Sequence, residues 1–66
     1  MEKTVLVQLY RHDGLCRVYF RQKGTRNRYC LQDAVSGPPE LFKCSHDGEP
    51  SHRVSREAYT LEPLLD

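Results

Sequence analysis

The sequence predicts a mainly β protein, all-β or α+β, built on a small antiparallel sheet of four to five short strands. Two observations favour this class: short segments alternate apolar with polar residues, and the pairs Asp13-Gly14 and Asp47-Gly48 separate such segments. Alternation with a period of two is typical of half-buried strands, and an Asp-Gly pair favours a tight hairpin turn. We expect one domain over residues 1–66, a meander that curls into an open SH3-like or OB-like barrel.

The first hairpin is predicted on both sides of the first Asp-Gly pair. If that pair forms a two-residue turn, Leu9 lies opposite Val18 and Val7 lies opposite Phe20, so that apolar residues share one face. The following strand then divides into two sets: Cys16, Val18 and Phe20 point inward, and Arg17, Tyr19 and Arg21 point outward.

A third strand is predicted over residues 28–32, after a polar loop at residues 22–27. Pairing Arg21 with Arg28 also pairs the apolar residues of the two strands, which supports this register. The resulting apolar pairs are Phe20 with Tyr29 and Val18 with Leu31.

The second half of the chain predicts a weaker hairpin, with strands at residues 41–45 and 52–55. A two-residue turn at the second Asp-Gly pair would place Leu41 opposite Val54, but it would also place Phe42 opposite Arg53. The tail at residues 55–66 fits two structures. It fits a short helix that Pro63 ends early, or a strand in which Tyr59 and Leu61 share a face. We favour a short helix or turn that covers the open end of the sheet.

The segment between Leu15 and Leu31 holds five basic residues and no acidic residue, although the formal net charge of the whole chain is only +1. Arg side chains bind phosphates, and an aromatic ring between them can stack on an unpaired base. We therefore predict a small non-enzymatic module that binds RNA or single-stranded DNA. The predicted contact residues are Arg17, Tyr19, Arg21, Lys23, Arg26 and Arg28.

Other interpretations of the same residues remain open. The basic residues fit an ordinary solvated face, in which Arg stems cover Tyr rings and the charge protects the sheet from aggregation. They also fit an adaptor or inhibitor that binds an acidic surface or a strand edge of a larger protein. Because 66 residues bury only a thin core, a homodimer is a further alternative.

Metal, cofactor and catalytic sites are not predicted. Cys44, His46 and His52 form the densest group of metal-ligand types, but their spacing differs from that of the common structural zinc motifs. No residues form the recognisable set of nucleophile, base and orienting group that catalysis requires. An odd number of cysteines (Cys16, Cys30 and Cys44), together with the lack of an apolar membrane segment or secretion signal, predicts a cytoplasmic protein with reduced thiols and no membrane partner.

Overall fold

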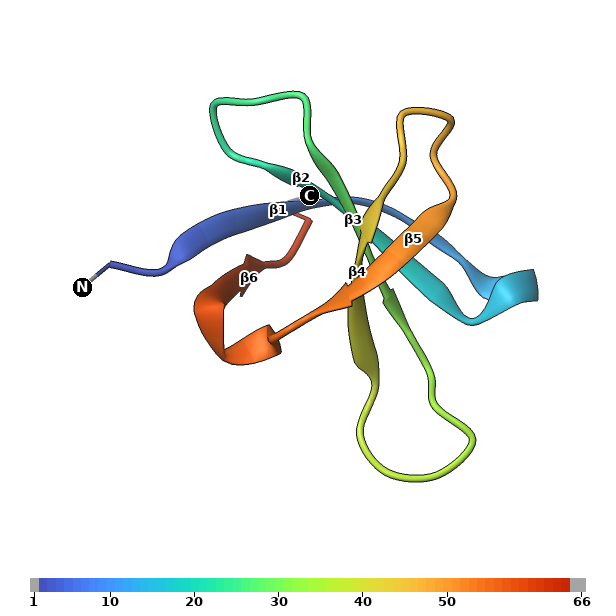
Figure 1. The fold of residues 1–66 in the computed structure, drawn as a ribbon. Helices are drawn as coiled ribbons and strands as arrows, with labels where there is room; N and C mark the ends of the chain where they lie inside the picture. The colour runs from blue at the N-terminus through green and yellow to red at the C-terminus, as the bar shows by residue number, and fades with distance from the viewer. Residues whose placement is uncertain (1, 65–66) are drawn as a thin grey trace.

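Six strands form one sheet in the order β5-β4-β3-β2-β1-β6 in the computed structural model, which describes residues 2–64 (Figure 1). β1 to β5 form an antiparallel meander, and β6 pairs with β1 in parallel. The sheet curls into an open half-barrel, which confirms the mainly β class with six strands instead of four to five. The strands are β1 (Thr4–His12), β2 (Arg17–Gln22), β3 (Arg28–Gln32), β4 (Glu40–Cys44), β5 (Pro50–Val54) and β6 (Tyr59–Glu62).

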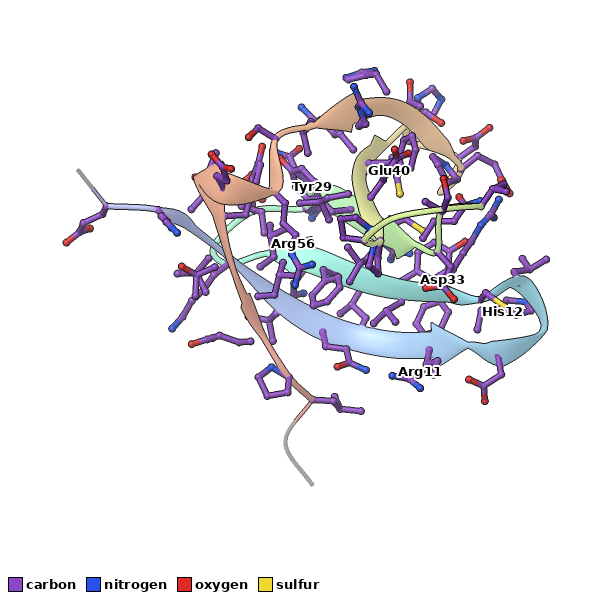
Figure 2. All side chains as sticks on the ribbon, turned by 90° about the horizontal axis from the view of Figure 1, so that it is seen from below. Arg11, His12, Tyr29, Asp33, Glu40 and Arg56 are labelled. Atoms are coloured by element: carbon purple, nitrogen blue, oxygen red, sulfur yellow. The ribbon has the colours of Figure 1, made fainter. Side chains whose placement is uncertain are left out.

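The concave, inner face of the sheet holds the core. Leu6, Phe20, Tyr29 and Leu41 are buried there, each from a different strand, and Figure 2 shows Tyr29 within the curl of the sheet. Full burial of such a side chain is worth about 1.5–3 kcal/mol, so these four residues contribute strongly to stability. Partly buried apolar residues surround them: Val18, Leu31, Val54, Tyr59 and Leu61.

Two predicted registers are confirmed. β2 and β3 pair Arg21 with Arg28, with the expected apolar pairs beside them. β4 and β5 pair Leu41 with Val54 and Phe42 with Arg53, as predicted, although the turn is longer than two residues and a bulge between Lys43 and Cys44 compensates for the difference. In β2–β3 the matching of apolar rows was sufficient to define which residues face each other.

The predicted register of the first hairpin is wrong. The connection is a 3-10 turn (Asp13–Leu15) followed by Cys16 in the left-handed region at φ 53°, so it is longer than a two-residue turn. A bulge between Gln8 and Tyr10 then shifts the pairing again. As a result Leu6, 0% exposed, enters the core in place of the residues of opposite parity, and Cys16 is exposed and does not point inward.

The tail forms the strand, which was the less favoured alternative, and the short helix ended by Pro63 is wrong for residues 59–62. A single 3-10 turn (Arg56–Ala58) leads from β5 to β6, and β6 then extends along β1 with Leu61 beside Leu6. Tyr59 and Leu61 pack against the core while Thr60 is exposed, which is the predicted alternation of a strand. Among the described residues, none lies in a helix that is long and apolar enough to cross a membrane.

Candidate nucleic-acid interface

The predicted contact residues of β2 and β3 lie on the convex, outer face of the sheet, opposite the core. Strand pairing places Arg21 beside Arg28 and Tyr19 beside Cys30 on this face, while Phe20 between them points into the core. Lys23 and Arg26 follow in the loop that joins the two strands. The outer face and the loop at its end therefore carry all six predicted residues, but the surroundings of these residues differ strongly from one end of β2 to the other.

Tyr19 and Arg17 are built into a small packed region at one end. Tyr19 is only 6% exposed, and its ring stacks on Tyr10 with the ring centres 4.9 Å apart. Arg17 Nη1 donates a hydrogen bond to the Tyr19 hydroxyl at 3.2 Å and lies 3.7 Å from Glu49 Oε2. The expectation of an exposed Tyr19 platform is therefore wrong, because a base could reach this ring only if Tyr10 moved away.

Two thiols complete this region, which we call the outer cluster (Tyr19, Cys30 and Cys44). Burial raises the pKa of the Cys30 thiol to about 11, and it also raises the pKa of Cys44. Both thiols therefore stay protonated at neutral pH. They behave as small packing groups rather than nucleophiles.

The other end of β2 carries exposed cations, which we call the basic end: Arg21, Lys23, Arg26 and Arg28. Residues 2–64 contain three ion pairs, and none of them includes a residue of the basic end. Glu57 and Glu62 of the tail also form no ion pair with it in this part of the chain, and Asp66, the third acidic residue of the tail, lies outside the described residues. The positive charge here is thus open to solvent.

Hydrogen bonds within the loop hold the backbone of the basic end in one conformation. Gln22 N donates to Asn27 O at 2.9 Å, and Thr25 N donates to Gln22 O at 3.0 Å. The Asn27 side chain donates to Gln22 Oε1 at 3.1 Å, and Gly24 supplies the positive φ of +82° that the turn needs. A loop braced in this way loses little conformational freedom when a ligand binds.

The same loop is anchored to the core. The Tyr29 hydroxyl, which lies 3.4 Å from Gln22 Oε1, donates to it, and the Tyr59 hydroxyl lies 3.5 Å from that of Tyr29. Burial, together with Tyr59, raises the pKa of Tyr29 to about 12, so its proton is retained at neutral pH. The loop that carries Lys23 and Arg26 is therefore attached to the rigid part of the protein.

A groove of about 520 Å³ separates the basic end from the β4–β5 turn at residues 45–49. Both segments project from the same side of the molecule in Figure 1. Sequence reasoning missed this groove, although the antiparallel pairing of β3 with β4 implies that their flanking turns lie at one end of the sheet. Its lining residues are Arg26, Asn27, Arg28, Cys44, Ser45, His46, Asp47 and Gly48.

Neither a metal centre nor a relative helps to assign the site. Across residues 2–64, no group of three or more His, Cys, Asp or Glu side chains is arranged to hold a metal ion. Comparison of the chain with protein-family models, curated proteins and solved structures finds no match. The class that the fold defines is a small β protein with an open, curled sheet.

Proposed function

We propose that this protein is a small, non-enzymatic module that binds RNA or single-stranded DNA through its basic end. One observation carries the proposal: four cations stand together on a braced loop and its flanking strands, and in the described part of the chain no carboxylate pairs with them. Arg21 and Arg28 lie directly opposite each other, and like charges in this arrangement destabilise a strand pair. A phosphate chain would remove that repulsion.

The proposed contact set is smaller than the set predicted from sequence. It keeps Arg21, Lys23, Arg26 and Arg28 and leaves out the other two residues, because Tyr19 is buried and Arg17 is shared between Tyr19 and Glu49. A net charge of +1 provides little attraction from the protein as a whole. Binding should therefore be of modest affinity and depend on local contacts.

The salt dependence of binding tests this proposal. Four phosphate contacts to a single strand predict a slope near −3 for the logarithm of the binding constant against the logarithm of salt concentration, at about 0.7 per phosphate. The measurement is fluorescence anisotropy of a labelled eight-nucleotide RNA over a range of salt concentrations. The variant Arg28→Gln should reduce the slope by about 0.7 and weaken binding at every concentration.

The matched control is Arg11→Gln. Arg11 is exposed, it lies next to the β1–β2 turn, away from the β2–β3 loop (Figure 2), and its only ion pair in residues 2–64 is a 4.0 Å contact with Asp13. This variant makes the same change in net charge and should leave the slope unchanged. Binding that does not depend on salt concentration, or an affinity that falls equally in both variants, would contradict the proposal.

A second candidate function is an adaptor that binds a larger protein, and the free edge of β5 favours it. β5 is the last strand on its side of the sheet, and Ser51, His52 and Arg53 are exposed along it. Such an edge can pair with a strand of a partner, and in a homodimer the partner is a second copy. A complex recovered from lysate that survives nuclease treatment would favour the adaptor, and sedimentation over a range of concentrations would detect the dimer.

The proposed location is the cytoplasm. Three free cysteines support it, since Cys30 and Cys44 are buried as thiols and Cys16 is exposed as one. A reducing compartment maintains all three in this state.

A further inference from the structure

The groove beside the basic end has two walls of different chemistry. Arg26 and Arg28 line one wall, and the β4–β5 turn forms the other with His46 and Asp47. A volume of about 520 Å³ lies in the range of sites that hold small ligands or single groups of larger ones. A ligand that satisfies both walls must present an anion on one side and a hydrogen-bond donor on the other.

Asp47 is held in place by its own turn. Its Oδ1 accepts hydrogen bonds from the Ser45 hydroxyl and from Glu49 N, the latter at 3.1 Å. Oδ2 takes part in no hydrogen bond or ion pair within residues 2–64. The bonds from Ser45 and Glu49 lower the pKa of Asp47, so at neutral pH the side chain is a carboxylate that can only accept hydrogen bonds.

We propose that the groove holds one nucleotide of the bound single strand, with a phosphate on Arg26 and Arg28 and the amino group of the base on Asp47. This inference rests on the proposed function and adds a base preference to it. Cytosine presents an amino donor on the edge where uracil presents a carbonyl oxygen, as thymine does. A carboxylate accepts from the first and repels the second, so the groove should prefer cytosine to uracil.

The charge of Asp47 argues against an acidic peptide as the occupant. A peptide with successive carboxylates would place one of them against Asp47, which would repel it, although the basic wall would accept another. A nucleotide carries both groups that the groove can satisfy, an anionic phosphate and a neutral base with a donor edge. His46, the exposed neighbour of Asp47, adds an aromatic ring on which a base can stack.

The test compares an eight-nucleotide RNA of cytosine with one of uracil at a single salt concentration. The wild-type protein should bind the cytosine strand at least about fivefold more tightly, the lower end for one base contact. Asp47→Asn keeps an Oδ1 acceptor for the turn but offers an amide donor in place of Oδ2. It should abolish or reverse the preference, while Asp33→Asn, the same change away from the groove, should preserve it.

A substituted ligand keeps the test independent of whether the variant folds. An RNA of 2-pyrimidinone, which is cytosine without its amino group, should bind wild-type protein more weakly than the cytosine strand, because it has no donor for Asp47. Equal affinity for cytosine and uracil, or a preference unchanged in folded Asp47→Asn, would overturn the base contact while salt-dependent binding still supported the proposed function. If the wild-type protein bound neither RNA, both the base contact and the proposed function would be overturned.

Discussion

Arg17 and Arg28 occupy the same face of the same sheet, yet they meet different neighbours. Arg17 donates to Tyr19 and lies beside Glu49 of the β4–β5 turn, and its side chain is only 20% exposed. Arg28 is exposed and forms no ion pair in the described chain. The difference shows that the turn reaching over the sheet, rather than the strand pattern, decides whether a cation packs or remains accessible.

The two ends also differ in how they use the Arg side chain. Beside the outer cluster the Arg17 side chain is mostly buried, and its Nη1 contacts Tyr19 and Glu49. Its Nε is buried and has no partner among the described residues, so the guanidinium depends on the contacts that its Nη1 makes. At the basic end the Arg and Lys side chains extend into solvent, so their charged groups are free to bind a ligand.

The largest expected effect is the loss of stability when Tyr19 is truncated. Tyr19→Ala removes a buried aromatic ring and should lower the free energy of unfolding by about 3–5 kcal/mol. Arg28→Ala removes an exposed side chain and should change it by less than about 0.5 kcal/mol. Urea unfolding followed by circular dichroism measures both.

Tyr19→Phe provides a folded comparison if the alanine variant does not fold. It keeps the ring and its stacking on Tyr10 but removes the acceptor of the Arg17 hydrogen bond, for a cost of about 1 kcal/mol. Equal losses of stability in Tyr19→Ala and Arg28→Ala would refute the distinction between a packed end and an accessible end.

The second prediction concerns alkaline pH, which should weaken the outer cluster first. The pKa of Cys30 rises from 9.0 to about 11 on burial, so the folded protein holds this proton more tightly than the unfolded chain. The resulting stability is complete below pH 9 and is lost as pH rises through 11. A shift of this size corresponds to at most about 2–3 kcal/mol.

Urea unfolding at pH 8, 9, 10 and 11 measures this loss. Cys30→Ala should be less stable at pH 8 but should show a flatter dependence on pH. Tyr29, whose pKa is also raised, from 10.0 to about 12, contributes in the same direction at higher pH, so the interval between pH 9 and 10 isolates the thiols. An equally steep decline in Cys30→Ala over that interval would show that the thiol is not responsible.

Residues that pair locally were predictable from the sequence, and residues brought together by the curl of the sheet were not. Apolar rows defined the register of β2–β3, and the second Asp-Gly pair predicted the register of β4–β5 up to its bulge. The same reasoning failed for β1, because the bulge and the left-handed Cys16 each change the pairing without an obvious sequence signal. The pairing of β6 with β1 was not predicted, since the two strands lie at opposite ends of the chain and no local turn joins them.

The candidate site divides in the same way. The position of Arg21, Lys23, Arg26 and Arg28 around one loop follows from a single hairpin, and sequence reasoning identified it. The burial of Tyr19 depends on Tyr10, on the Arg17 side chain and on two cysteines from other strands. The groove likewise needs a turn from the second hairpin, which lies at the same end of the sheet because β4 pairs antiparallel with β3.

The smallest expected effect has opposite signs in two measurements. Arg21 faces Arg28 directly, and such a like-charged pair destabilises the strand pairing by about 0.2–1 kcal/mol. Arg21→Gln should therefore raise the free energy of unfolding of the unliganded protein while it weakens RNA binding. The gain should shrink in 1 M salt, where the screening length is only about 3 Å.

Arg11→Gln separates this effect from a general change in charge. Arg11 lies opposite Val18, so its replacement relieves no facing cation and should leave both measurements nearly unchanged. If an Arg side chain only packs, replacing it should lower the free energy of unfolding. If it is only solvated, replacing it should change neither stability nor RNA binding. A variant should gain stability and lose RNA binding only where two cations repel each other in the free protein and both bind the same anion. An Arg21→Gln protein that is less stable than wild type would place this end in the same class as the outer cluster.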